Sequence, residues 1–218
     1  MAESFEALVA RVAACRACPR MEGRRRVLGA GNGPLRASLL VVATAPGRFG
    51  AERTGVPLCG DRSGATFEAM LDGVGLCRGD VFVTNAVLCN PQDGRGRNAA
   101  PTAAELRACA GHLAATLELV AAPHVLALGR IAHAALLRIG PAPLDFAACL
   151  GRWHPWAGRQ LAAVYHPSPQ VTADPRRQAA MRAQWQALFA ARPVQLPVVN
   201  RQVRSTLRPS TVATSRAV

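Results

Sequence analysis

Four apolar runs of strand length, separated by stretches with helical periodicity, constrain the fold of this chain more than any other feature. The runs are SLLVVAT (38–44), VFVTNAV (81–87), HVLALG (124–129) and LAAVYH (161–166). Strands that alternate with helices form parallel sheets through right-handed crossovers, and helices cover both faces of such sheets. We therefore predict an α/β fold, a single-domain three-layer α/β/α arrangement around a four-stranded, mainly parallel sheet.

The helical patterns place five helices around this sheet. They are expected at 3–14, 63–74, 102–121, 130–138 and 174–190. After Arg192 the pattern ends, because the chain mixes Pro, Ser, Thr, Val and Arg without periodicity. We predict one domain over residues 1–192 and a disordered basic tail over 193–218.

Apolar runs in this sequence stay well below the length of about 18 residues that a membrane-spanning helix needs. The N-terminal segment carries Glu3 and Glu6 rather than a basic leader followed by an apolar block. Seven cysteines form an odd set, which argues against a disulfide framework and favours metal ligation. We expect a soluble, cytoplasmic protein without a membrane segment.

The formal net charge is +13, and every basic residue is arginine. Guanidinium groups bind phosphates bidentately, so this excess favours a nucleic-acid partner. The alternative is a general bias of the sequence towards arginine and alanine. Because the chain has no lysine, no side-chain amine is present to form a Schiff base with a sugar aldehyde.

Four of the cysteines have a spacing that can surround one metal site. Cys15 and Cys18 form a C-x-x-C pair, Cys89 follows the second strand, and Cys109 lies in the helical pattern that follows. Thiolates from these positions suit zinc or a [4Fe-4S] cluster, and the spacing does not separate the two. The alternative is that Cys89 and Cys109 are small core residues.

Polar loops follow the strand ends, where open α/β sheets bind ligands. Three of them are APGRFGAERTGVPLCGDRSG (45–64), TNAVLCNP (84–91) and YHPSPQ (165–170). Asp61, Asn85 and His166 supply a carboxylate, an amide and an imidazole to this edge of the sheet. Each of the three also has a structural interpretation, as a helix cap, a strand-end cap or a packed loop residue.

These motifs together resemble the iron-sulfur uracil-DNA glycosylases. The similarity is closest to the family-five branch, through R-T-G, G-D-x-S-G and H-P-S in this order, and it includes features of the family-four branch. It implies a structural [4Fe-4S] cluster on Cys15, Cys18, Cys89 and Cys109, with zinc less favoured. It also implies that Asp61 is the catalytic carboxylate, that Asn85 faces the base, and that His166 contacts a base carbonyl oxygen.

Two positions depart from the family-four pattern. The Glu that precedes Pro-Gly in that branch is absent, because this chain reads Thr44, Ala45, Pro46, Gly47. The aromatic residue that stacks on uracil there corresponds to Leu58, and Phe49 is the alternative stacking residue. We expect Ala45, Pro46, Gly47 and Leu58 to line the base site, and the aliphatic wall extends the substrate range to hypoxanthine and xanthine.

DNA contacts are expected around the rim of this site. Arginines 48, 53, 95 and 97 would hold phosphates, and Ser168 with Gln170 or Val171 would lie where the base is extruded. The loop 90–101 lacks the basic, histidine-ending insert of the relatives that crosslink to DNA. The expected partner is double- or single-stranded DNA with deaminated bases, bound by a monomer.

The resemblance thus implies a monofunctional DNA-repair glycosylase that hydrolyses the N-glycosidic bond of uracil and leaves an abasic site. The lysine-free sequence argues separately against lyase activity. Three other interpretations remain open at this point. They are a non-catalytic protein that binds damaged DNA, an iron-sulfur redox protein, and a small nucleotide-binding protein of doubly wound fold.

Overall fold

The computed structural model describes residues 3–140 and 144–190. The predicted tail, residues 193–218, lies outside the described residues. Five strands form one sheet in the order β2-β1-β3-β5-β4. Their bounds are β1 Leu39–Ala43, β2 Val81–Asn85, β3 His124–Leu128, β4 His154–Trp156 and β5 Arg159–Val164. The four longer strands are parallel, and β4 pairs antiparallel with β5.

The three-layer α/β fold is confirmed, but the predicted strand number is wrong, because the sheet has five strands. The additional strand, β4, is three residues long and contains Pro155, which is tolerated because β4 lies at the edge of the sheet. Trp156 and Arg159 face each other across a two-residue turn. Both turn residues, Ala157 and Gly158, have positive φ, as in the tight turns that suit β-hairpins. An alanine in such a turn is a weak sequence signal.

The long helices lie close to their predicted positions. The eight α-helices of the described residues are α1 Phe5–Ala14, α2 Ala51–Thr54, α3 Arg62–Gly73, α4 Ala103–Val120, α5 Arg130–Leu137, α6 Phe146–Cys149, α7 Pro169–Thr172 and α8 Pro175–Phe189. Three short 3-10 helices lie at Pro19–Met21, Ala30–Asn32 and Arg78–Asp80. The single-turn helices α2, α6 and α7 were not predicted, because one turn of helix leaves no periodicity to detect.

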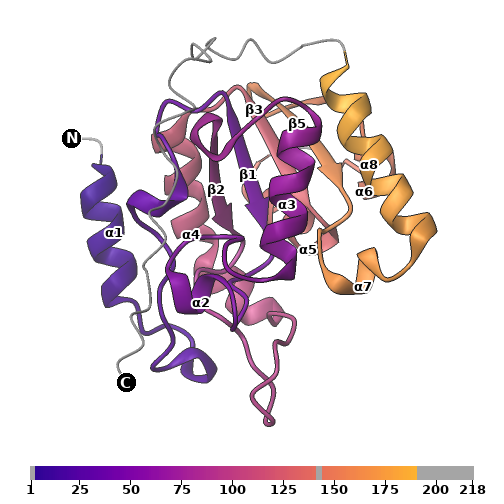
Figure 1. The fold of residues 1–218 in the computed structure, drawn as a ribbon. Helices are drawn as coiled ribbons and strands as arrows, with labels where there is room; N and C mark the ends of the chain where they lie inside the picture. Colours follow the sequence, from indigo (N-terminus) through magenta and orange to yellow (C-terminus); the bar gives the residue numbers. More distant parts are fainter. Residues whose placement is uncertain (1–2, 141–143, 191–218) are drawn as a thin grey trace, which may run out of the picture.

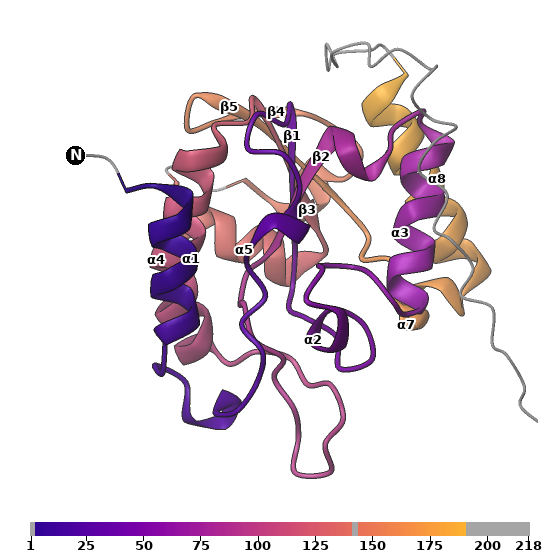
Figure 2. The ribbon, with the colours of Figure 1, turned by 60° about the vertical axis from the view of Figure 1, so that its left-hand side comes forward.

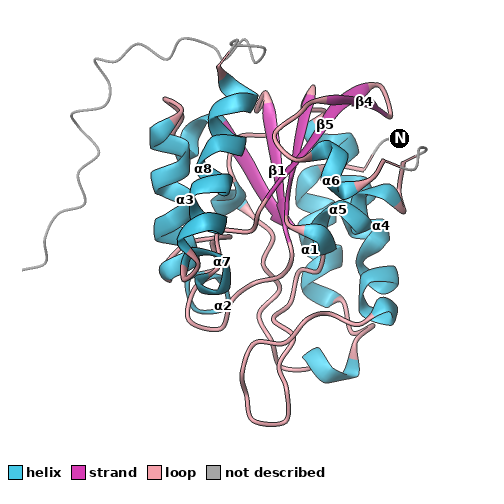
Figure 3. Cartoon of the chain, turned by 90° about the vertical axis from the view of Figure 1, so that its right-hand side faces the viewer, coloured by secondary structure: helices cyan, strands magenta, loops and turns pink. Residues whose placement is uncertain are grey.

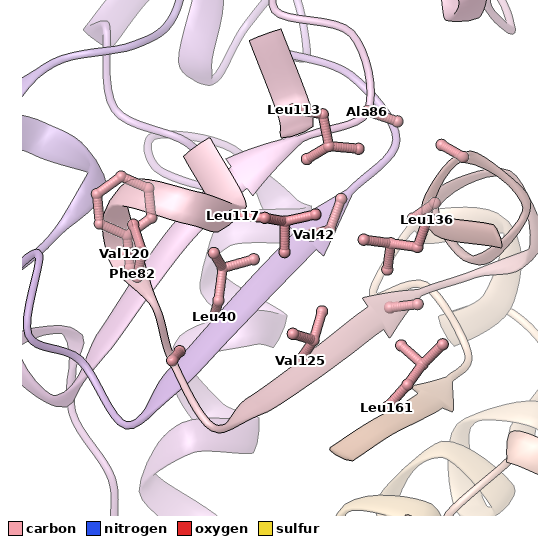
Figure 4. Close-up of a cluster of buried hydrophobic side chains, with 14 of the residues drawn as sticks. Leu40, Val42, Phe82, Ala86, Leu113, Leu117, Val120, Val125, Leu136 and Leu161 are labelled. Carbon is pink, nitrogen blue, oxygen red and sulfur yellow. The ribbon is translucent and has the colours of Figure 1, made fainter. Parts of the chain in front are cut away.

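Figure 3 shows the sheet between two helical layers, with α3 and α8 on one side and α1, α4, α5 and α6 on the other. Alternate residues of the strands serve the two layers: Leu40 and Phe82 belong to the cluster with α4, and Val41 and Val83 to the cluster with α3 and α8. The close-up of the first cluster shows apolar side chains from β1, β2, β3 and β5 together with Leu113 and Leu117 of α4 (Figure 4).

The end of the sheet where the parallel strands finish carries the long loops. In Figure 1 these loops and α2 lie at the lower end of the sheet, and the loop after β2 extends farthest from it. In the turned view, α1 lies beside α4 at one flank (Figure 2). Within residues 3–140 and 144–190, no helix is both long and apolar enough to cross a bilayer.

Candidate active site

A cavity of about 730 Å³ opens at the carboxyl ends of the parallel strands. Its walls come from the loop after β1, the start of α3, the loop after β2, the first turn of α5 and the segment after β5. This is the edge at which open α/β sheets bind ligands. Of the predicted residues, those that line the cavity are Ala45, Pro46, Gly47, Phe49, Leu58, Asp61, His166, Ser168 and Gln170.

Asp61 has two roles in the local structure. Its Oδ1 accepts a hydrogen bond of 2.9 Å from the backbone N–H of Gly64, which caps α3. The other oxygen lies against the loop after β1, where a Cβ on Gly47 would be 2.8 Å from Oδ2 and one on Gly50 would overlap it. Glycine at these two positions gives the carboxylate room. The predicted cap and the predicted cavity carboxylate are therefore the same group.

His166 lies two residues beyond the end of β5, in the Pro-rich segment that leads to α7. Its carbonyl accepts a 2.8 Å hydrogen bond from the N–H of Ser168, which turns the backbone. Desolvation by the surrounding protein lowers the pKa of His166 to about 4, and the Asp61 carboxylate opposes that shift. The imidazole is therefore neutral at pH 7, and one ring nitrogen can donate a hydrogen bond without carrying charge.

Asn85, the last residue of β2, does not line the cavity. It is 2% exposed, and strand alternation puts it on the same face as Val83, towards α3 and α8. Its Nδ2 is buried and has no hydrogen-bond partner within the described residues. Asn85 is in register with Ala43, the last residue of β1. Thr44, which follows Ala43 in the sequence, lines the cavity.

Two other asparagines, Asn90 and Asn98, line the cavity and were missed by the sequence analysis. Asn90 donates through Nδ2 to the carbonyl of Pro46 and, over 2.9 Å, to Oδ1 of Asn98. The same Asn98 oxygen accepts from the backbone N–H of Arg48 over 3.0 Å. These bonds tie the loop after β2 to the loop after β1. One feature of the sequence could have indicated them: Asn90 and Asn98 lie in the loop that follows the end of β2, at the ligand-binding edge of the sheet.

The four predicted ligand cysteines come from the N-terminal segment, the loop after β2 and α4. Cys18, Cys89 and Cys109 pack around Met21 and Val87 in one cluster. Burial is the main cause that raises the pKa of Cys89 and of Cys109 to about 11, and Cys15 and Cys18 raise both further by charge repulsion. No group of three or more metal-ligating side chains in the described ranges lies close enough to hold a metal ion.

An ion pair between Arg20 and Glu105 joins the segment after the C-x-x-C pair to α4. Arg20 lies next to the C-x-x-C pair and donates to both carboxylate oxygens of Glu105, over 2.8 and 2.6 Å. Glu105 also accepts from the backbone N–H of Thr102 at the start of α4. The bond to Arg20 is the main cause that lowers the pKa of Glu105. The cysteine-bearing segments are thus fixed to each other by polar contacts outside the thiols.

A comparison with models of known protein families identifies a family whose matched region contains this site. A family model described as the uracil DNA glycosylase superfamily matches residues 30–189. The chain belongs to this superfamily. The matched residues include all five strands and the cavity loops, so the superfamily assignment covers the whole sheet and the predicted catalytic pair.

Individual relatives in the superfamily support the same assignment. The chain is 36% identical over 198 residues to a type-5 uracil-DNA glycosylase of Thermus thermophilus, with 77% of this chain and 88% of the relative covered. It is 30% identical over 174 residues to a type-4 uracil-DNA glycosylase of Thermotoga maritima, covering 76% and 82%. A type-5 uracil-DNA glycosylase of Mycobacterium tuberculosis is 31% identical over 199 residues, covering 75% and 72%.

The wall of this superfamily member's cavity at Leu58 has an unusual backbone. Leu58 has a φ of +49°, and its carbonyl accepts a 2.7 Å hydrogen bond from Nη2 of Arg78. Leu58 is only 8% exposed and also packs in the apolar cluster with α3 and α8. The aliphatic side chain expected at this wall is therefore fixed in part by the core.

None of the predicted DNA-binding arginines is among the lining residues of the cavity. Arg53 donates from α2 to the carbonyl of Gly60. Arg95 and Arg97 lie on the extended loop after β2, where Arg97 pairs with Asp93 at 2.8 Å. A second cavity of about 390 Å³ adjoins His166 and is lined by Arg130 and Arg177. His166 thus lies between the first cavity and a second one that is lined by cationic groups.

Proposed function

We propose that this protein is a uracil-DNA glycosylase of DNA repair, a hydrolase that cleaves the N-glycosidic bond of uracil and leaves an abasic site. The observation that carries the proposal is that one carboxylate, Asp61, and one neutral imidazole, His166, share a cavity at the ligand-binding edge of the sheet. Membership of the superfamily and the activity printed for the type-4 and type-5 relatives support it.

Cleavage of the glycosidic bond leaves positive charge on the sugar and negative charge on the base, and an enzyme must stabilise both charges as they form. The Asp61 carboxylate suits the sugar cation. The neutral imidazole of His166 suits the base, because it donates a hydrogen bond to the carbonyl oxygen where negative charge develops. Since the pKa of its cationic form is about 4, His166 is neutral during the reaction, and it acts as a hydrogen-bond donor rather than as a general acid from the imidazolium form.

Asn85 remains our proposed contact to the edge of the base. Its buried Nδ2 lacks a partner within the described residues, so it can donate to a uracil carbonyl oxygen without breaking a bond in the free protein. An amide also offers an acceptor for the uracil N–H, which cytosine lacks at that position. The backbone of Ala45, Pro46 and Gly47 would complete the base site.

We also propose that the reaction is monofunctional and that hypoxanthine and xanthine are further substrates. The absence of lysine from the sequence removes the usual amine for strand cleavage. Leu58 in place of an aromatic wall leaves a site that is less specific for a pyrimidine ring. We infer that the protein acts as a monomer in the cytoplasm, and that residues 1–192 form its domain.

A [4Fe-4S] cluster on Cys15, Cys18, Cys89 and Cys109 belongs to this proposal. The donor set is all sulfur, which suits iron-sulfur centres, and the packing of Cys18, Cys89 and Cys109 in one cluster supports the proposal. The cluster would supply covalent links between the N-terminal segment, the loop after β2 and α4. Its proposed role is structural, because none of these four cysteines lines the cavity of Asp61 and His166.

The test is a base-release assay. Oligonucleotides that contain uracil, hypoxanthine, xanthine or only normal bases are incubated with the protein, and abasic products are then cleaved with alkali. We expect cleavage of the uracil strand after alkali and an intact strand without it. Binding of the uracil strand with no base release would favour the non-catalytic DNA-binding alternative, and amine-dependent cleavage without alkali would contradict the monofunctional reaction.

A further inference from the structure

Phe49 is a large apolar side chain that the protein leaves in water. It is 60% exposed, against 37% for Leu35, the other exposed large apolar residue within the described ranges. A single exposed apolar side chain is common on protein surfaces and implies nothing by itself. The position and the anchoring of Phe49 are what distinguish it.

Phe49 lines the cavity that holds Asp61 and His166. The inner apolar lining is buried, with Leu58 8% and Ala51 2% exposed, so the exposed ring of Phe49 must lie at the mouth. The turn that carries it is closed by a 3.1 Å hydrogen bond from the N–H of Gly50 to the carbonyl of Gly47. The aromatic ring is thus presented at the entrance by a hydrogen-bonded turn.

The ring is held from one side. The guanidinium carbon of Arg48 lies 4.2 Å from the centroid of the Phe49 ring, within the range of a cation–π contact. Arg48 is itself fixed, because its Nη1 donates to the carbonyl of Gly96 and its backbone N–H donates to Asn98. One face of the ring is therefore covered by a positive group, while most of the residue stays accessible.

We propose that Phe49 stacks, through the face that Arg48 leaves open, on the DNA base next to the nucleotide drawn into the cavity. Extrusion of a nucleotide breaks its stacking with the neighbouring base, and an apolar side chain can replace that contact. A ring with one covered face can stack on one base but cannot insert between two. The guanidinium beside it places positive charge near the phosphate of the same nucleotide.

This inference rests on the proposed glycosylase function and adds the residue that holds the distorted DNA. It concerns the DNA stack outside the cavity, in contrast to Leu58, which would contact the extruded base. Arg48 acts as a positioning residue, because its guanidinium orients the Phe49 ring.

The test uses a duplex with a tetrahydrofuran abasic analogue, which cannot be cleaved, and a fluorescent 2-aminopurine as the neighbouring base. We expect the wild-type protein to change the 2-aminopurine fluorescence on binding. Phe49→Ala should abolish this change and weaken binding by about 5- to 150-fold, the range for loss of one base–aromatic stack. Phe49→Trp should keep both. Leu35→Ala, the matched loss of an exposed apolar side chain, should behave as wild type.

Uracil release by the same proteins separates the two proposals. If wild type releases uracil while Phe49→Ala binds the analogue and changes the fluorescence as wild type does, the stacking inference is wrong and the glycosylase proposal stands. If Phe49→Ala loses uracil release but leaves the fluorescence change intact, Phe49 contacts the extruded base and the inference is also wrong. If wild type releases no uracil from any substrate, the proposed function itself fails.

Discussion

Gly129, the residue after β3, lies directly against His166: a Cβ on Gly129 would be 3.2 Å from the Cβ of His166. Gly129 has a φ of +87°, and its N–H donates a 2.9 Å hydrogen bond to the carbonyl of Val164 at the end of β5. Two adjacent parallel strands thus end in a close backbone contact. This contact sets where the imidazole enters the cavity.

Gly129→Ala should therefore displace His166. With φ +87° and ψ 169°, Gly129 lies in a backbone region that is essentially restricted to glycine, so a side chain there costs about 1–3 kcal/mol of stability, and the added methyl also presses on His166. We expect a loss of about 10- to 100-fold in kcat/KM for uracil release, since small displacements of a catalytic group have effects of that size. Gly158→Ala is the matched control, because Gly158 has a φ of +74° and a Cβ there would meet no other atom of the described chain within 4 Å. Equal activity in the two variants would contradict this role of Gly129.

Asp61→Asn should separate the two roles of Asp61. Asparagine caps helices as well as aspartate does, so we expect the melting temperature to change little. The charge that stabilises the sugar cation is lost, so kcat/KM should fall by about 100-fold or more, while DNA affinity is kept. Asp145→Asn removes the charge of another helix-capping aspartate, at α6, and should leave activity unchanged. Full activity of Asp61→Asn would assign the catalytic carboxylate elsewhere.

The sequence was most informative about which segments lie together at one edge of the sheet. Parallel strands end at the same edge, so the motifs with Asp61 and His166 could be placed together without knowledge of distances. This reasoning does not decide the orientation of Asn85, whose contact with the base stays a proposal. A residue at a strand end can face either side of the sheet or the cavity, and only the strand register fixes which.

Side-chain networks and very short elements were less accessible to sequence reasoning. Asn90 and Asn98 reach the cavity because the loop between them folds back, with Gln92 paired to Asn98 in an isolated bridge. Such a fold depends on several weak hydrogen bonds rather than on a periodic pattern. The edge strand β4 was missed for a related reason, since three residues carry too little alternation to indicate a strand.

Acid should destabilise the protein between about pH 6.5 and pH 4. His166 has a folded-state pKa of about 4, below its ordinary value, so the unfolded chain binds more protons than the folded chain in this window. Stability is therefore complete above the window and falls as the pH decreases through it. Burial also lowers the pKa values of His112, His124 and His133, and these groups act in the same direction.

Thermal melts from pH 7.5 to pH 4 test this prediction. The melting temperature of wild type should fall across the window. The melting temperature of His166→Asn should fall less steeply, and its remaining pH dependence should come from the other three histidines. An identical pH dependence for the two proteins would show that His166 is solvated in the folded state.

Glu105→Gln should destabilise the protein more than the loss of an exposed ion pair does. The Glu105 side chain is 8% exposed and receives both bonds from Arg20, so we expect a loss of about 1.5–3 kcal/mol in the free energy of unfolding. Glu3→Gln is the control, because the Glu3–Arg11 pair is more exposed and should contribute less to the free energy of unfolding. Urea unfolding of both variants gives the comparison, and equal losses would contradict the structural role of the Arg20 contact.

Cys109→Ser should remove the proposed iron-sulfur cluster. The purified wild-type protein is expected to be brown, with absorbance at about 400 nm from thiolate-bound iron. The variant should lose this absorbance together with its iron and sulfide. Because metal binding to the folded state adds to stability, the melting temperature should fall as well. Cys149→Ser is the matched control, since Cys149 is also buried but packs in the apolar cluster with α4 and α5.

The two serine variants also distinguish loss of the cluster from loss of packing. If Cys149→Ser lowers the melting temperature as much as Cys109→Ser while retaining the colour, the stability loss reflects a buried hydroxyl rather than the metal. Colourless wild-type protein with one equivalent of zinc would replace the cluster by a single ion. Retention of iron by Cys109→Ser would exclude Cys109 from the ligand set, and the Arg20–Glu105 pair would then be a link between the segment after the C-x-x-C pair and α4 that does not involve the metal.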